Sequence, residues 1–189
     1  MSEYTKPVTG EWDYTEANGE AKVVREYDEL VTLTPGNTVP PMIQKLTGIS
    51  TQDILDRGIP KQQVCADIAD MFRGNTLLIA YNAHFDLSFL YYLLLRSGDP
   101  TALKGKDKLD LLTVYKDRRS YPHKLCNAID AYGLSGKVVN SHRAVDDVLA
   151  TVEVMKAMEA ERDDLCRYLN LFGYNPKYGI SASRQREDA

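Results

Sequence analysis

Residues 76–81 contain the feature that most constrains the fold, a short and continuous apolar run that reads Thr-Leu-Leu-Ile-Ala-Tyr. A run of this length is typical of a strand buried at the centre of a sheet. Residues 85–97 follow directly, and they are apolar almost all round a helix, so we expect this helix to pack on more than one side. The strand and helix together predict an α/β fold.

Further strands and helices are indicated along the rest of the chain. Residues 11–17 and 20–33 flank Asn18-Gly19, a pair typical of a tight hairpin turn, and predict two antiparallel strands. A proline-rich segment, 34–41, predicts a loop. Helices are expected at 51–57, at 61–73 after Pro60, at about 124–132, and from near Ser141 to about 160 with a continuation towards 170; residues 109–116 fit a strand or a short helix.

The composition fits one globular domain over residues 1–172, followed by a polar tail over 173–189. The chain of 189 residues has no apolar run long enough to span a membrane, and its first residues have no apolar stretch, so we expect no signal peptide. Its cysteines are far apart in the sequence, which favours free thiols in the cytoplasm. The net charge of −4 argues against a protein that coats duplex DNA, and it leaves an enzyme open.

The first group of residues suited to chemistry is Asn82-Ala-His-Phe-Asp86, directly after the apolar run. The carboxyl end of a central strand is where α/β proteins place ligands, so Asp86 would lie at the mouth of a site. The alternative is that Asp86 merely caps the following helix, as aspartate commonly does.

The second group is Ser141-His-Arg-Ala-Val-Asp-Asp147, which opens the last long helix. Asp147 heads a stripe with Thr151, Val154 and Met158 that is otherwise apolar or small, whereas Asp146 lies on a more polar flank. A separate stripe is expected to form the core face of this helix: Val145, Val148, Leu149, Val152 and Met155. The alternative is a Ser141 cap with acids that the helix dipole favours.

In this order and spacing, the two groups resemble the motifs of the DEDDh branch of the DnaQ-like 3′→5′ exonucleases. The family's second motif reads roughly NAxFD, which residues 82–86 match. Its third reads HxAxxDA, which His142 to Asp147 match, with Val148 in place of the final alanine. Leu109-Asp110, His123-Lys124-Leu125 and residues 46–50 also resemble family segments, and the resemblance covers about residues 20–160. It implies a ribonuclease H-like mixed sheet flanked by helices.

The resemblance also implies an activity, namely metal-dependent release of nucleoside monophosphates from single-stranded 3′ ends. Asp86 and Asp147 would bind Mg²⁺ or Mn²⁺ in a two-metal site, and His142 would be the general base. Asn82 and Phe85 would contact the substrate. A polymerase or another replication or repair protein is the implied partner, and the sequence leaves DNA and RNA both open.

The family's first motif, Asp-x-Glu on the first strand, has no counterpart in this sequence. The hairpin at 11–33 resembles the family's second and third strands, so we expect the first strand to be lacking and the ladder edges of its neighbours to be exposed. Glu11 and Asp13 have the right spacing in reverse order, and they or an upstream segment could supply the carboxylates. Otherwise the chain is a catalytically impaired pseudo-exonuclease that binds nucleic acid or a protein.

A basic segment between the two motifs could contact a single strand. It includes Lys116, Arg118 and Arg119, interleaved with Tyr115 and Tyr121, and such a mixture suits phosphates and bases. The alternative is a solvated charged loop, because three aspartates dilute the basic charge.

Overall fold

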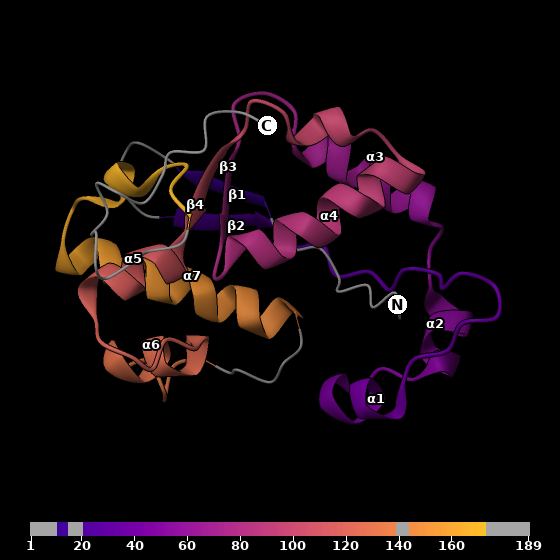
Figure 1. The fold of residues 1–189 in the computed structure, drawn as a ribbon, viewed down its shortest axis with the longest axis horizontal. Helices are drawn as coiled ribbons and strands as arrows, with labels where there is room; N and C mark the ends of the chain where they lie inside the picture. The colour runs from indigo at the N-terminus through magenta and orange to yellow at the C-terminus, as the bar shows by residue number, and fades with distance from the viewer. Residues whose placement is uncertain (1–10, 15–20, 139–143, 173–189) are drawn as a thin grey trace.

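The computed structural model describes residues 11–14, 21–138 and 144–172, with side chains from residue 26 onward. Figure 1 shows the arrangement of its strands and helices. In chain order these are β1 (Glu11–Tyr14), β2 (Ala21–Arg25), α1 (Pro41–Thr47), α2 (Thr51–Arg57), α3 (Lys61–Met71), β3 (Leu77–Ala80), α4 (Ala83–Ser97), η1 (Pro100–Leu103), β4 (Asp107–Asp110), α5 (Leu111–Arg118), α6 (Leu125–Ala131), α7 (Ala144–Glu161) and η2 (Leu165–Tyr168). No described helix is both long and apolar enough to cross a membrane.

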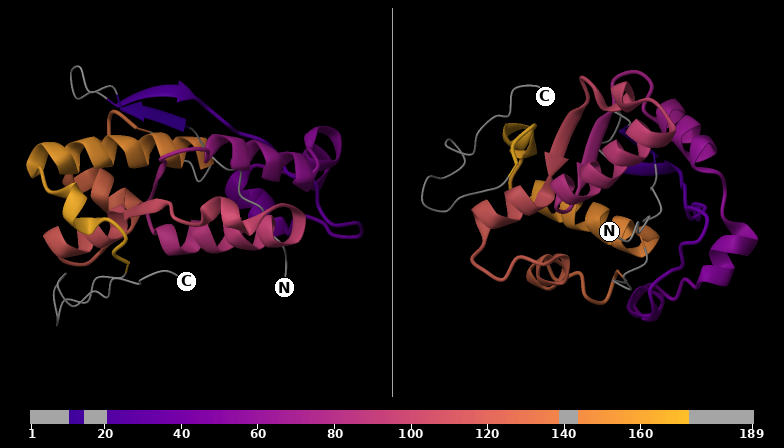
Figure 2. Two further views of the ribbon diagram at one scale, coloured as in Figure 1. Left: turned by 90° about the horizontal axis from the view of Figure 1, so that it is seen from above. Right: turned by 45° about the vertical axis from the view of Figure 1, so that its right-hand side comes forward.

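The strands form two separate pairs. β1 and β2 pair antiparallel, as predicted, although the second strand ends at Arg25 and does not continue to residue 33. The predicted turn at Asn18-Gly19 lies outside the described residues. β3 and β4 pair in parallel, with Leu77 opposite Asp107 and Ala80 opposite Asp110. In the left view of Figure 2, the β1–β2 hairpin forms an outer layer. Helices α3 and α7 lie between this hairpin and helix α4. The fold is therefore α/β with a reduced sheet, as predicted.

The apolar strand β3 is not buried at the centre of a sheet. The side chain of Leu77 is 43% exposed, and the other residues of β3 are half-buried. Among the described strands, β4 alone pairs with β3, so the second ladder edge of β3 has no described partner strand. The prediction of a buried central strand was wrong. An apolar run indicates that a strand forms, but it does not indicate whether other strands pair with both of its edges.

Helix α4 packs on one side, whereas the sequence predicted packing on several. It lies beside α3 and against the β3–β4 pair (Figure 1). Within α4, burial is limited to Ala83 and Leu94. Leu87, Leu90 and Leu93 are half-buried. The large apolar residues on the rest of the helix surface are between 44% and 58% exposed: Phe85, Phe89, Tyr91, Tyr92 and Leu95. The short sheet explains this difference, because a strand pair offers little surface to cover a helix.

The core is divided into two clusters. The larger one joins β4, α5, α6, α7 and η2, and includes Leu111, Val114 and Met158 at 0% exposure. The smaller one lies between α3 and α4 and includes Ile68 and Leu94. Two partly buried residues also pack against the larger cluster. They are Ile79, in β3, and Tyr81, directly after β3.

Two N-terminal helices follow from local signals. The predicted helix 51–57 is confirmed as α2. Its N-cap is Ser50, whose hydroxyl accepts a hydrogen bond from the N–H of Asp53 at 3.0 Å, while the Ser50 N–H donates to the Asp53 carboxylate at 2.8 Å. Helix α1 was missed, because the prolines of 34–41 indicated a loop. Pro41 occupies the first turn of α1, where its missing N–H is harmless.

The C-terminal half follows the predicted order with two differences. Residues 109–116 contain the end of β4 and most of α5, so both alternatives hold in part. Helix α7 ends at Glu161 and does not continue to 170. Its expected core stripe was partly wrong, because Leu149 is 38% exposed and the residues that are buried are Ala150, Thr151, Val152, Val154 and Met158.

Candidate functional site

The chain leaves β3 through a tight turn at Asn82. Asn82 has φ 69° and ψ 52°, which is left-handed backbone that a residue with a side chain rarely adopts. Its carbonyl accepts a hydrogen bond from the N–H of Phe85 at 2.9 Å and so begins helix α4. The Asn82 side chain makes no capping hydrogen bond and is exposed. The motif at 82–86 therefore lies at the carboxyl end of β3, as the sequence predicted.

Asp86 lies in the first turn of α4 and is half-buried. The N-cap position belongs to Asn82, so Asp86 is not the helix cap that the alternative interpretation proposed. Phe85, one residue earlier, is 44% exposed, and its ring centroid lies 4.8 Å from that of Phe89. An apolar ring and a carboxylate therefore occupy consecutive positions in the first turn of one helix.

Asp147 lies in the first turn of α7. Its Oδ1 atom is buried, and its main-chain carbonyl accepts a hydrogen bond from Thr151 Oγ1 at 2.6 Å. Thr151, Val154 and Met158, the other members of its stripe, are all buried. This confirms that the stripe headed by Asp147 turns inward. His142 precedes the helix at a position outside the described residues.

The described donors do not make a complete metal centre. Asp86 and Asp147 offer carboxylate oxygens, which hard divalent cations prefer. Within the described ranges, however, no group of three or more His, Cys, Asp or Glu side chains could hold a metal ion. Glu11 and Asp13 lie in β1 opposite Arg25 and Lys22, and their side chains are outside the described part of the structure. The described donor set thus falls short of a two-metal site.

Asp110, which the sequence analysis named only as part of a family-like segment and gave no role, organises the mouth of the site. The carboxylate of Asp110, at the end of β4, is 4% exposed. It accepts hydrogen bonds from the backbone N–H of Asn82 at 2.9 Å and of Ala83 at 3.2 Å. It also caps α5 through the N–H of Leu112 at 3.1 Å. The available signal was an aspartate directly before a helix, which is typical of an N-cap.

Tyr81, the residue before Asn82, anchors the start of the same turn. Its hydroxyl donates to the carbonyl of His123 at 2.9 Å, which ties the end of β3 to the segment before α6. Burial raises the pKa of the Tyr81 phenol, so it stays protonated and remains a donor at neutral pH. No local sequence pattern predicts this contact, because the two residues are 42 positions apart.

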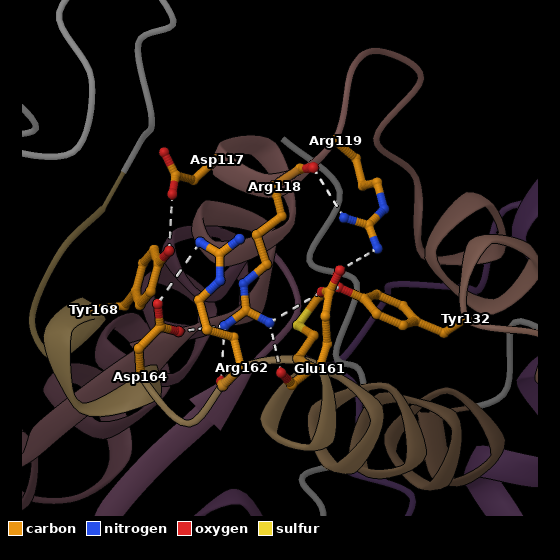
Figure 3. A network of polar contacts seen from close by, with 9 residues as sticks. Asp117, Arg118, Arg119, Tyr132, Glu161, Arg162, Asp164 and Tyr168 are labelled. Carbon is orange, nitrogen blue, oxygen red and sulfur yellow. Dashed lines mark hydrogen bonds and ion pairs between the residues drawn. The ribbon is translucent and has the colours of Figure 1, made fainter.

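The basic segment contributes less to the surface than predicted. The guanidinium of Arg118 is 0% exposed and forms ion pairs with Glu161 at 3.3 Å and with Asp164 (Figure 3). Burial alone would lower the pKa of Arg118, but its interactions with Tyr168, Tyr132 and Asp164 hold that pKa above its ordinary value. Arg118 therefore joins α5 to α7, and the prediction that it contacts substrate was wrong.

The neighbouring basic residues are more accessible. Arg119 is 34% exposed in its side chain, pairs with Glu161 at 2.5 Å, and lies 5.2 Å from the ring centroid of Tyr132. Lys116 is half-buried on α5. Tyr121 is 85% exposed, and its ring meets that of His123 edge-on with centroids 5.8 Å apart. Lys116, Arg119 and Tyr121 are therefore at least partly accessible to solvent, whereas the Arg118 side chain is not.

Comparisons with known proteins point to one family. The sequence model described as "Exonuclease" (RNase_T) matches residues 15–155, which is more than half of the chain. The DNA polymerase III subunit epsilon of Treponema pallidum is 31% identical over 130 residues, 67% of this chain and 58% of that protein. The PolC-type DNA polymerase III of Clostridium perfringens is 32% identical over 123 residues, but this covers 65% of the chain and 8% of the polymerase.

Solved structures share the fold. E. coli exonuclease I in complex with a dT13 oligonucleotide superimposes with a TM-score of 0.62 at 23% identity, over 79% of this chain and 35% of that one. Exonuclease I of Methylocaldum szegediense gives a TM-score of 0.58 at 21% identity, over 78% of this chain and 34% of that one. The chain therefore spans only part of the length of the proteins that it resembles.

Proposed function

Because this chain belongs to the DnaQ-like 3′→5′ exonuclease family, we propose that it supplies the Asp86, His142 and Asp147 part of a metal-dependent exonuclease site for single-stranded 3′ ends. The observation that carries the proposal is the placement of two carboxylates in the first turns of α4 and α7. Asp86 follows the carboxyl end of a strand, and Asp147 heads the inward stripe of the last long helix.

Each residue has a proposed role. Asp86 and Asp147 would hold Mg²⁺ or Mn²⁺ through their oxygens, and the bound ion would supply charge neutralisation at the phosphate. His142 would take a proton from the attacking water, because its ordinary pKa lies near neutrality. The water oxygen bonds to phosphorus while the bond from phosphorus to the preceding sugar's 3′ oxygen breaks. That oxygen takes up a proton, and a nucleoside 5′-monophosphate leaves.

The substrate would meet exposed groups around this turn. Asn82 is exposed at the mouth and suits the terminal nucleotide, and the exposed ring of Phe85 suits a base. Lys116 and Arg119 are the basic residues that remain available for phosphates, and Tyr121 offers a further ring. Stacking and phosphate contacts of this kind tolerate different sequences, which suits an enzyme that shortens ends of any sequence.

The same observations limit the activity of this chain. A two-metal clamp needs more fixed oxygens than two carboxylates provide. We therefore expect weak binding of divalent cations and little or no cleavage by the 189 residues alone. A pseudo-exonuclease that binds nucleic acid or a protein is the second candidate. The absent Asp-x-Glu motif and the lack of a three-donor group among the described residues favour it.

The relatives suggest the biological setting. A DNA polymerase III subunit is among them, and the similar solved structures include E. coli exonuclease I with a dT13 oligonucleotide and an ExoI/SSB-Ct complex. We propose a nucleic-acid substrate, a replication or repair protein as partner, and a cytoplasmic location. The domain would occupy residues 1–172, with residues 173–189 as a polar tail whose structure lies outside the described ranges.

Binding of Mn²⁺, followed by electron paramagnetic resonance, tests the site assignment. Asp86→Asn and Asp147→Asn should each weaken binding by about tenfold or more, because each removes a charged ligand. Asp56→Asn is the matched control, since Asp56 is an exposed acid on α2. Equal affinities for the wild type and all three variants would contradict the assignment.

A further inference from the structure

Asp110 is a buried carboxylate that the proposed mechanism does not use. Its side chain is 4% exposed at the junction of β4 and α5. It accepts four hydrogen bonds. The donors are the N–H groups of Asn82, Ala83 and Leu112, at 2.9, 3.2 and 3.1 Å, and the hydroxyl of Thr113 at 3.2 Å. A buried carboxylate held by donors in this way is fixed in position.

The two donors from the β3–α4 turn converge on a single atom. The successive N–H groups of Asn82 and Ala83 both point at Oδ1 of Asp110. Successive N–H groups that converge form a concave anion site, and here the anion is supplied by the protein itself. β3 and β4 are parallel and in register, with Ala80 opposite Asp110, so the carboxylate is placed directly beside the turn.

The turn needs this support because of its backbone. Asn82 has a left-handed conformation, with φ 69°, that costs free energy for a residue with a side chain. Its own side chain makes no cap hydrogen bond to α4. The first hydrogen bond of α4 runs from the Phe85 N–H to the Asn82 carbonyl, so the geometry of the turn sets the direction in which the first helical turn leaves β3. Phe85 and Asp86 are both in that turn.

We propose that Asp110 is a positioning residue for the candidate site. It holds the Asn82 turn in its left-handed form and thereby fixes the first turn of α4, which carries Asp86. This inference rests on the proposed function, because it gives the turn a role in metal binding. The two parallel strands would then have different roles. The segment after β3 carries the metal ligand Asp86, and the end of β4 carries Asp110, which holds that segment in place.

Three variants test the proposal with two independent measurements. Asp110→Ala removes the acceptor, and Asp110→Asn retains an oxygen at the same position. Asp107→Ala is the control, because Asp107 lies at the other end of β4, is exposed, and accepts a hydrogen bond from Asn170 at 2.9 Å. The first measurement is hydrogen exchange of the Asn82 and Ala83 amides by NMR. The second is Mn²⁺ affinity, at a temperature where all variants are folded.

Asp110→Ala should accelerate exchange at the Asn82 and Ala83 amides more than at amides of the α3–α4 cluster. It should also weaken Mn²⁺ binding about tenfold, as loss of a group that orients a ligand does. Asp110→Asn should recover most of both losses, and Asp107→Ala should change neither. In the Asp110→Ala background, Asn82→Gly should slow the exchange of Ala83 again, because glycine adopts the left-handed form without strain.

The outcomes separate this inference from the function on which it rests. If the wild type binds no Mn²⁺, the proposed function fails, and the exchange data then decide the role of Asp110 in the turn. Faster exchange confined to residues 82–86 supports that role, and uniform acceleration through the chain overturns it. If the wild type binds Mn²⁺ and Asp110→Ala binds it equally well, the positioning role is wrong.

Discussion

The guanidinium of Arg118 donates a hydrogen bond to the main-chain carbonyl of Met158 at 2.6 Å, which joins the end of α5 to α7 (Figure 3). Asp164 and Glu161 neutralise the buried charge. Nearby, the hydroxyl of Tyr168 donates to Asp117 at 2.8 Å, and burial together with this bond raises the pKa of Tyr168 to about 12. The network holds the last turn of α7, the helix that carries Asp147 at its other end.

Arg118→Ala should lower the free energy of unfolding by about 3 kcal/mol or more, because it removes the buried partner of the Asp164 carboxylate and leaves that carboxylate only the longer ion pair with Arg162, at 3.9 Å. Arg119→Ala is the matched control. Its guanidinium is partly exposed, so its ion pair with Glu161 should contribute about 1 kcal/mol or less. Urea denaturation followed by circular dichroism measures both. Similar small losses for the two variants would show that Arg118 is not a structural anchor.

Glu161 should make stability depend on pH. Burial raises its pKa, but hydrogen bonds from Arg119 and Tyr132 outweigh this effect, so its pKa in the folded state is below the ordinary value. The sign follows from linkage. A lowered folded pKa stabilises the protein above the unfolded pKa, about 4.3, and this stabilisation disappears as the pH falls through the folded pKa.

Glu161→Gln should therefore lower the free energy of unfolding at pH 7 by roughly 1 kcal/mol, since Glu161 is only partly shielded from solvent. The difference from the wild type should shrink towards zero as the pH falls below the ordinary pKa of glutamate. Glu153→Gln serves as the control, because the ion pair of Glu153 with Lys156 lies on the surface. A difference that grows on acidification would contradict the sign of this argument.

The edge of β3 that no described strand covers should promote self-association. Edge strands with apolar side chains pair readily with other chains, and lysine on an edge opposes such pairing. Leu77→Lys should shift the protein towards the monomer in sedimentation velocity experiments. Leu55→Lys is the matched control, because Leu55 is 71% exposed on α2, away from the strands. Equal shifts for both variants, or a wild-type monomer at all concentrations, would rule out the β3 edge as the contact.

Asp147 and Asp146 should differ in metal binding although they are neighbours. The stripe of Asp147 is buried along α7, and one of its carboxylate oxygens is shielded from solvent. Asp147→Ala should weaken Mn²⁺ binding about tenfold or more. Asp146→Ala should leave it nearly unchanged, as isothermal titration calorimetry can measure. Large and equal losses would show that both acids take part and that the stripe does not distinguish them.

The sequence predicted the type and order of most elements, because these depend on local patterns. The run at 76–81 formed β3, and Ser50 with Asp53 began α2. Burial was predicted less well. Leu77 and Phe85 are apolar and exposed, because burial depends on which other segments cover them. A basic pattern likewise cannot show that Arg118 is enclosed by residues more than 40 positions later.

The positions of the candidate site residues were also predicted in part. The placement of Asp86 after a strand and of Asp147 on an inward stripe followed from the sequence. The support from Asp110 did not, because its hydrogen bonds to Asn82 and Ala83 link positions 28 and 27 apart in the chain. Parallel pairing of β3 with β4 creates this proximity, and pairing partners are a tertiary property.

We propose that this chain is an exonuclease domain with an incomplete metal site. The most direct test is digestion of a single-stranded oligonucleotide, labelled at its 5′ end, by the purified 189-residue chain in the presence of Mg²⁺. We predict little or no shortening beyond that seen with Asp147→Ala. Robust, stepwise shortening from the 3′ end that is abolished by His142→Ala would contradict the claim, because it would show that the chain completes its own metal site.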